Sequence, residues 1–149
     1  MTSAFSTKLY TPDQPLNEDE LAATIDFLHR HLQQYGDAPE DIRKAIGYAM
    51  GHNQAPGGFV LQGLDGDSIL GVVVVNETGM KGYIPENILV YIAVDQSRRG
   101  MGIGRQLMKK ALQSVEGAVA LHVEPDNPAK HLYERLGFTN KYLEMRYQK

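Results

Sequence analysis

The sequence predicts an α/β (α+β) fold in which a mixed, mostly antiparallel central sheet is flanked by helices. Two amphipathic helical stretches lie between residues 17 and 50, and strand-like apolar runs dominate residues 58–94. The apolar run Ile88–Val94 then leads through a glycine-rich turn into another amphipathic stretch. A chain of 149 residues with 42% hydrophobic content is enough for one core, so we expect a single domain over residues 1–149.

The first third of the chain is predicted to form one edge strand and two helices. Residues 5–10 suit a short strand, which Pro12 ends. Asn17 is a typical helix N-cap, and Gly36 is expected to end the helix that it starts. A second helix is expected from Pro39 to about Met50. The apolar residues at helical spacing in these two helices are Leu21, Ile25, Leu28, Leu32, Ile42, Ala45, Ile46 and Ala49.

Strand patterns dominate the middle of the chain. Gly58–Leu64 and Ser68–Asn76 flank an Asp-Gly-Asp turn, which predicts a hairpin. The run Ile88–Val94 is continuously apolar, so we expect a central strand that is buried on both faces. After a helix to about Leu112, the further predicted elements are a fifth strand at Val119–Val123, a short helix at Pro128–Leu136 and a final strand or strand pair at Phe138–Tyr147.

Composition excludes several classes of protein. A net charge of −3 and the absence of a long basic run argue against nucleic-acid binding. With no cysteine there is no disulfide framework, no thiolate metal site and no cysteine nucleophile, and we expect no metal ion. The N-terminal stretch lacks the apolar core of a signal peptide, and no apolar run approaches the length of a membrane span. We therefore expect a cytoplasmic protein without a membrane partner.

Three glycines separate the strand Ile88–Val94 from the next helix. Gly100, Gly102 and Gly104 remove Cβ atoms where a ligand would approach the backbone. The free amide groups of a helix's first turn, together with the positive end of the helix dipole, favour a phosphate group. The pattern therefore predicts an anion site, although an ordinary glycine-rich turn would look similar.

Two familiar phosphate-binding motifs do not fit this turn. A Walker loop continues with Lys and Ser or Thr, whereas Arg105 follows Gly104. The third glycine of a dinucleotide-binding turn would stand at Arg105 or Leu107. Following an apolar strand, the pattern Arg99-x-x-Gly102-x-Gly104 resembles instead the acyl-CoA-binding motif of the GNAT superfamily of N-acetyltransferases.

A second motif strengthens this resemblance. The run L-Y-E-R-L-G-F from Leu132 to Phe138 is similar to the C-terminal GNAT pattern L-Y-E-x-L-G-F. Asn127 stands where that pattern has an asparagine, but the step from Asn127 to Ala129 is one residue short, which leaves Asp126 as an alternative. Together the two motifs and the elements between them cover residues 68–147.

The resemblance implies a GNAT fold, splayed between the fourth and fifth strands, with acetyl-CoA as co-substrate. Backbone groups near Ala93 and Val94 are then expected to hold the pantetheine arm, and the amides of residues 99–104 the pyrophosphate. Arg98, Arg99 or Arg105 could add charge. The residues expected at acetyl-CoA are Ile92, Ala93, Val94, Arg99, Gly100, Met101, Gly102, Ile103, Gly104, Arg105 and Asn127.

The same resemblance suggests catalytic roles for two residues. Tyr133 matches the family tyrosine beside the sulfur atom of CoA and is the candidate general acid, although a core tyrosine would show the same spacing. Ile88 and Val90 occupy the positions where some members carry an acidic base on the central strand. A histidine side chain can exchange a proton near neutral pH, so we predict His122 as the base. The alternatives left open are Glu86, Glu77, Tyr91 and a water chain.

The function implied is transfer of an acetyl group from acetyl-CoA to a primary amine, of a small molecule or of a peptide or protein, in a ternary complex. The rival hypothesis is a non-catalytic acyl-CoA-binding sensor or regulatory subunit on the same fold. Apolar alternation in Lys141–Tyr147 favours a homodimer that pairs these segments. The residues proposed to line an acceptor cleft are Tyr35, Tyr48, His52 and Glu77.

Overall fold

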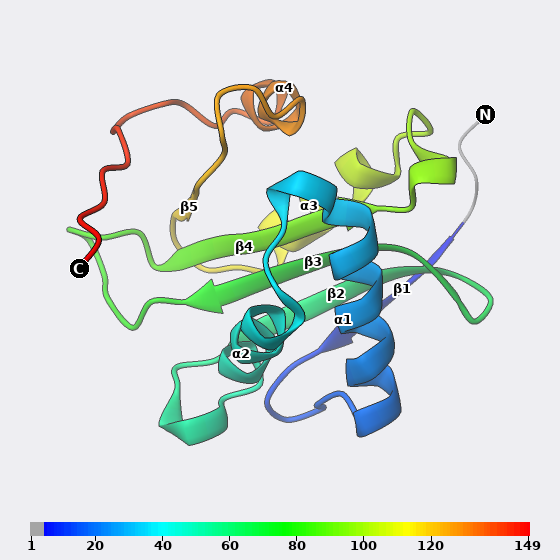
Figure 1. The fold of residues 1–149 in the computed structure, drawn as a ribbon. Helices are drawn as coiled ribbons and strands as arrows, with labels where there is room; N and C mark the ends of the chain where they lie inside the picture. The colour runs from blue at the N-terminus through cyan, green and yellow to red at the C-terminus, as the bar shows by residue number, and fades with distance from the viewer. Residues whose placement is uncertain (1–4) are drawn as a thin grey trace.

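The computed structural model describes residues 5–149 as a five-stranded sheet with helices on both faces (Figure 1). The first four strands pair antiparallel in chain order, and β5 joins β4 in parallel. The predicted mixed, mostly antiparallel sheet is therefore confirmed. The strands are β1 (Ser6–Tyr10), β2 (Gly58–Asp65), β3 (Ser68–Glu77), β4 (Asn87–Val94) and β5 (Val119–Leu121).

Helices α1 (Glu18–Leu32) and α2 (Pro39–Ala49) cover one face of the sheet, and α3 (Ile103–Gln113) and α4 (Ala129–Arg135) the other. A capping box starts α1: the Asn17 side chain accepts from the Glu20 amide, and the Glu20 carboxylate accepts from the Asn17 amide. The expected end of α1 at Gly36 is wrong, because Gln33 adopts a φ of 54° and ends the helix after Leu32. No helix within residues 5–149 is long and apolar enough to cross a membrane.

A β-bulge in β4 decides which face each of its later side chains joins. Val74 of β3 lies opposite Tyr91, but the next residue, Val75, lies opposite Leu89, so Val90 is the extra residue. Leu89 packs under α3, whereas Tyr91 packs under α1 and α2. After the bulge, each side chain of β4 therefore lies on the opposite face from the one that regular alternation would give.

The close packing of α3 depends on a glycine in β3. A Cβ atom on Gly71 would lie 2.6 Å from Cδ1 of Leu107, which is closer than real contacts allow. Leu107 is fully buried together with Ile103 and Met108 of the same helix. Glycine at this position therefore lets the first turns of α3, and the loop before them, lie close to the sheet.

The C-terminal part of the sequence-based prediction is wrong. Residues 138–149 form neither the predicted strand nor a strand pair, and β5 ends at Leu121 instead of Val123. Apolar alternation favours a strand, but a strand also needs a hydrogen-bonded neighbour, and β5 offers a sheet edge of only 3 residues. In Figure 1 the segment after α4 is drawn without a strand and does not join the sheet.

Candidate active site

The loop between β4 and α3 has the geometry of an anion site. Gly100 and Gly102 have φ values of 82° and 81°, in the left-handed region that favours glycine. Gly102 is the N-cap of α3 without a side-chain cap, and its carbonyl accepts the first helical hydrogen bond from the Gln106 amide. Among the described residues, the first-turn amides that begin at Ile103 have no acceptor. They are thus available to a ligand.

The three arginines near this loop differ in their partners. Arg98 forms an ion pair with Asp65 at 3.4 Å. Arg99 donates to the carbonyl oxygen of His31 at 2.8 Å, at the C-terminal end of α1. Arg105 is exposed and forms no ion pair within residues 5–149. Of the three, Arg105 is therefore the side chain that can add charge at the start of α3 without losing a protein partner.

The sequence analysis missed the role of His31. Its side chain is only 8% exposed, and its Nδ1 atom accepts from the amide of Gln96 at 3.2 Å. Burial lowers the pKa of His31, which favours the neutral ring that this bond requires. Because Arg99 also binds the His31 carbonyl, α1 holds the segment that leads into the glycine loop. The signal in the sequence is a histidine four residues after Phe27, whose ring lies 4.5 Å away.

The two motifs meet in space. A Cβ atom on Gly104 would lie 3.4 Å from Cγ2 of Val94 and 3.7 Å from Cδ2 of Leu132, so β4, the start of α3 and α4 converge there. The next residue, Tyr133, is 8% exposed, and its ring centroid lies 5.9 Å from that of Phe138. Burial raises the pKa of Tyr133 to about 12. The Tyr133 hydroxyl makes no hydrogen bond within the described residues, yet it is not fully buried. It is therefore accessible to solvent.

Strand β4 loses its parallel neighbour halfway along its length. Pairing with β5 covers Asn87 to Leu89, while β4 continues to Val94. Beyond the bulge, Ile92 and Val94 pack on the α3 side and Ala93 on the α1 side. The predicted splay between the two strands stays a prediction. The end of the pairing nevertheless leaves backbone groups of β4 without a partner in β5.

The segment after β5 carries the other predicted residues. Leu121 and Val123 pack against the core under α3, whereas His122 is exposed, in agreement with the predicted alternation. The Asn127 side chain accepts from the Ala129 amide at 2.9 Å and so holds the start of α4. Contact of Asn127 with acetyl-CoA stays a prediction.

Two of the alternative bases already have structural partners. Tyr91 donates to the Asp37 carboxylate, and burial followed by this bond raises the pKa of Tyr91, which disfavours the phenolate. Glu86 accepts from the amides of Ala118 and Gly82, which lower its pKa. Both groups hold loops in place. Within residues 5–149, no group of three or more His, Asp or Glu side chains is arranged to hold a metal ion.

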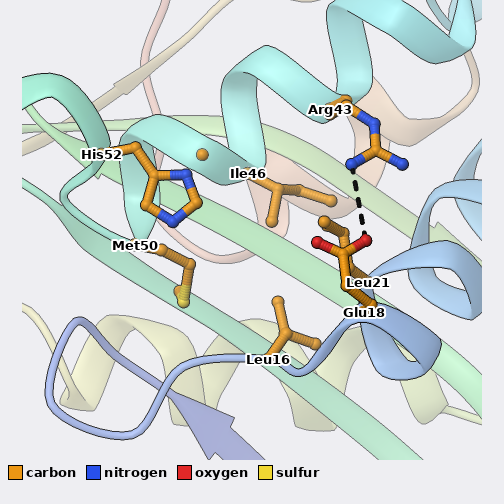
Figure 2. A pocket seen from close by; sticks show the side chains of 8 residues that line it. Leu16, Glu18, Leu21, Arg43, Ile46, Met50 and His52 are labelled. Atoms are coloured by element: carbon orange, nitrogen blue, oxygen red, sulfur yellow. Dashed lines mark ion pairs between the residues drawn. The ribbon is translucent and has the colours of Figure 1, made fainter.

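Of the residues expected to line an acceptor cleft, Tyr48 and Glu77 are in contact, whereas Tyr35 and His52 have other neighbours. Tyr35 donates to the Asp126 carbonyl, and Tyr48 donates to that of Glu77. His52 lines a separate hollow between α1 and α2 (Figure 2). Ten residues of α1 separate this hollow from His31, about 15 Å along a helix, so it is not part of the glycine site. The hollow has a volume of about 160 Å³ and is lined by Leu16, Glu18, Leu21, Arg43, Ile46, Gly47, Met50 and His52.

Together, the mixed sheet and the glycine loop at the start of α3 define an α/β domain with an anion-binding helix terminus. The chain belongs to the Acetyltransferase (GNAT) family, which matches residues 8–138. This match includes both motifs described above.

Two curated relatives share part of the chain. It is 36% identical over 89 residues to a mycothiol acetyltransferase of Rhodococcus erythropolis, a match that covers 56% of this chain and 30% of that protein. A mycothiol acetyltransferase of Catenulispora acidiphila is 33% identical over 79 residues, which cover 50% of this chain and 25% of that protein. The matches thus span less than a third of these relatives.

Solved structures confirm the GNAT fold over the whole chain. A GNAT-family acetyltransferase of Streptococcus pneumoniae has a TM-score of 0.71 at 20% identity, with 98% of both chains covered. An aminoglycoside N-acetyltransferase in complex with CoA has a TM-score of 0.68 at 16% identity and covers 100% of this chain and 98% of that one. These likenesses establish the fold and leave the acceptor open.

Proposed function

We propose that this domain is an acetyl-CoA-dependent N-acetyltransferase that moves the acetyl group to a primary amine of a small molecule, peptide or protein by direct attack in a ternary complex. The observation that carries the proposal is the close approach of the first turn of α3 to α4, where a Cβ atom on Gly104 would lie 3.7 Å from Cδ2 of Leu132. It brings a helix start with free amide groups next to the helix that bears Tyr133. Family membership and the CoA complex of a structural neighbour support the same donor.

The chain's own groups would bind the donor mainly through its backbone. Amides from Arg99 to Arg105 face the pyrophosphate, and the Arg105 side chain adds a positive charge. Backbone groups of Ile92 to Val94, beyond the end of the β5 pairing, bind the pantetheine arm and polarise the thioester carbonyl. Asn127 shapes the loop that leads to α4. Acetyl-CoA supplies the thioester whose acetyl group is transferred.

Tyr133 would assist the departing sulfur. A phenol with a pKa of about 12 keeps its proton at neutral pH. A thiol has a pKa of roughly 8.5. Full transfer of a proton from this phenol to the departing thiolate is therefore uphill. We therefore assign Tyr133 a hydrogen bond to the sulfur as the carbon–sulfur bond breaks, while the new carbon–nitrogen bond forms. The proton that the amine loses balances the one that the thiolate finally gains.

The amine must lose a proton before or during attack. His122 is exposed directly after β5 and can take that proton, either directly or through water. Tyr91 and Glu86 are less suitable, because both are engaged in structural hydrogen bonds. Some relatives are named as aminoglycoside and mycothiol acetyltransferases. An acceptor screen therefore begins with an aminoglycoside, followed by small amines and peptide α-amines.

Calorimetric titration with acetyl-CoA tests the donor site. We expect wild-type protein to bind acetyl-CoA and Gly102→Glu to lose that binding, because a carboxylate would then occupy the anion site. Gly66→Glu is the matched control: Gly66 also has a positive φ, of 59°, but lies in the β2–β3 turn with open space around it. Absence of binding to the wild type, or equal loss in the control, would overturn the assignment of the loop.

Turnover of the Tyr133→Phe variant separates an enzyme from a sensor. We expect CoA release with an accepted amine to fall by a factor on the order of 10²–10⁴, with acetyl-CoA affinity nearly unchanged. Tyr142→Phe, at a 79% exposed tyrosine, is the control and should keep full activity. Acetyl-CoA binding without turnover across the amine screen would favour the non-catalytic sensor.

A further inference from the structure

The hollow between α1 and α2 reaches from the surface to the apolar core (Figure 2). Its apolar lining consists of Leu16 and Leu21 around the start of α1, and of Ile46 and Met50 around the end of α2. Ile46 is fully buried, and Met50 is 7% exposed. The volume of about 160 Å³ is similar to that of an engineered apolar cavity of about 150 Å³ that holds benzene. The hollow can therefore take a side chain of the size of leucine or phenylalanine.

Gly47 leaves space at one end of this hollow. It lies inside α2, where glycine is less favourable than alanine. Its φ lies outside the left-handed region, so the backbone conformation does not require glycine. A Cβ atom at this position would lie 3.2 Å from Nδ1 of His52, which is tighter than most real contacts. The missing side chain of Gly47 therefore leaves room between α2 and His52, which both line the hollow.

A carboxylate and a guanidinium lie together at the other end of the hollow. Figure 2 shows Glu18 and Arg43 on the side opposite His52. Nη1 of Arg43 lies 4.0 Å from Oε2 of Glu18, which is too long for a hydrogen bond. Within residues 5–149 neither side chain has another ion-pair partner. Both groups can therefore bind the charges of a ligand without breaking a hydrogen bond of the fold.

We propose that this hollow binds a free α-amino acid with an apolar side chain of the size of leucine or phenylalanine. Arg43 binds its carboxylate, Glu18 binds its ammonium group, and its side chain fills the apolar hollow. The two charged groups of an α-amino acid are attached to one carbon atom, so they lie as close together as the two protein charges. A ligand with a single charge would match only one of them.

The site is separate from the proposed transfer of the acetyl group. It lies at the start of α1, about 15 Å along the helix from His31, so the bound amino acid is not the acceptor amine. Glu18 and Arg43 are 87% and 55% exposed, so each charge contributes little to binding. For a ligand of this size we therefore expect a Kd on the order of 0.1–1 mM.

A titration with L-leucine, followed by proton–nitrogen correlation spectra, tests the site. We expect saturable shifts of the amide signals of Gly47 and Met50, while the amide of Gly66 in the β2–β3 turn stays unchanged. Isoamylamine lacks the carboxylate of leucine, and isocaproate lacks its ammonium group. Each should bind roughly threefold to tenfold more weakly than leucine. Glycine has no side chain to fill the hollow and should cause no saturable shift.

Variants of the lining separate the contributions of shape and charge. Gly47→Leu fills the hollow and should abolish binding. Arg43→Gln should weaken the binding of leucine roughly threefold to tenfold but leave that of isoamylamine unchanged, because isoamylamine has no carboxylate. Lys44→Gln is the matched control. It removes the same charge from the next residue of α2, which is 81% exposed and does not line the hollow, and should bind leucine like the wild type.

Three outcomes would overturn the proposal. The first is shifts that do not saturate or that spread beyond the hollow. The second is equal binding of leucine and its two analogues, because the Glu18–Arg43 pair would then not select a ligand with both charges. The third is a loss in Lys44→Gln as large as that in Arg43→Gln. The titration contains neither acetyl-CoA nor an acceptor, so its result does not depend on the proposed acetyl transfer.

Discussion

The two faces of the sheet are packed by different means. Under α3 and α4 the buried cluster consists of apolar residues and Tyr133, and the buried polar residue Asn87 binds the carbonyls of Glu116 and Ala118 after α3. Under α1 and α2 the apolar cluster is accompanied by the buried polar side chains of Thr24, Gln62 and His31. The first face carries both family motifs, and the second carries neither.

This difference indicates a division of roles. On the α3 face the groups proposed to bind the donor are mostly backbone amides, so the side chains of α3 need only pack closely against the sheet. On the α1 face the buried side chains of Gln62, Thr24 and His31 have defined partners: Gln62 donates to Thr24 at 2.8 Å, and His31 accepts from Gln96. The bond from Gln96 to His31 and the bond from Arg99 to the His31 carbonyl also lie on the α1 side. They hold the glycine loop, whose amides are proposed to bind the donor.

Truncation at the centre of the apolar face should have the largest effect. Leu107 is fully buried and packs over Gly63 and Gly71. We expect Leu107→Ala to lower the free energy of unfolding by about 2–5 kcal/mol, since it removes buried apolar volume and leaves a cavity. Urea denaturation measures this change. Leu143→Ala, at an 83% exposed leucine, is the control, and a similar loss there would contradict the packing described.

Removal of a hydrogen bond on the polar face should cost less. Thr24→Val keeps the shape of the side chain but leaves the amide of Gln62 without its acceptor. We expect a loss of about 1–3 kcal/mol in the free energy of unfolding, because a buried donor then lacks a partner. Adding Gln62→Leu should recover most of that loss in a double-mutant cycle. A double variant as unstable as the sum of the single variants would mean that the pair is not coupled.

The sequence allowed prediction of the features that depend on local patterns. The glycine loop was recognisable because positive φ values and a free helix start both select glycine at Gly100 and Gly102. The N-cap at Asn17 and the β2–β3 hairpin also follow from residues close together in the chain. The family and its fold could therefore be predicted before any contact was known.

Other features could not be predicted because they depend on contacts distant in the sequence. The bulge at Val90 leaves no mark in the apolar run of β4, yet it decides that Tyr91 faces α1. The bond between His31 and Gln96 joins residues 65 positions apart. The alternation after Phe138 suggested a strand, but strand formation depends on a neighbouring edge, and the edge that β5 offers is only 3 residues long.

The smallest predicted effect concerns the pH dependence of the polar face. Burial lowers the pKa of His31 below its usual 6.5, against the attraction of Asp95 and Asp26 and with the repulsion of Arg30 and Arg99. Between the lowered value and 6.5 the unfolded chain binds more protons than the folded one. The contribution of His31 to stability is therefore complete above pH 6.5 and is lost as the pH falls below it.

Urea denaturation between pH 7.5 and pH 5 tests this prediction with His31→Asn, whose side-chain oxygen can still accept from Gln96 but does not titrate. Other groups titrate in both proteins, so the informative quantity is the difference between the wild type and the variant. We expect the stability of the wild type to fall further than that of His31→Asn as the pH decreases. Parallel pH profiles would mean that the pKa of His31 is the same in the folded and unfolded chains, so that its bond to Gln96 adds nothing to stability. In that case α1 would hold the glycine loop through Arg99 alone.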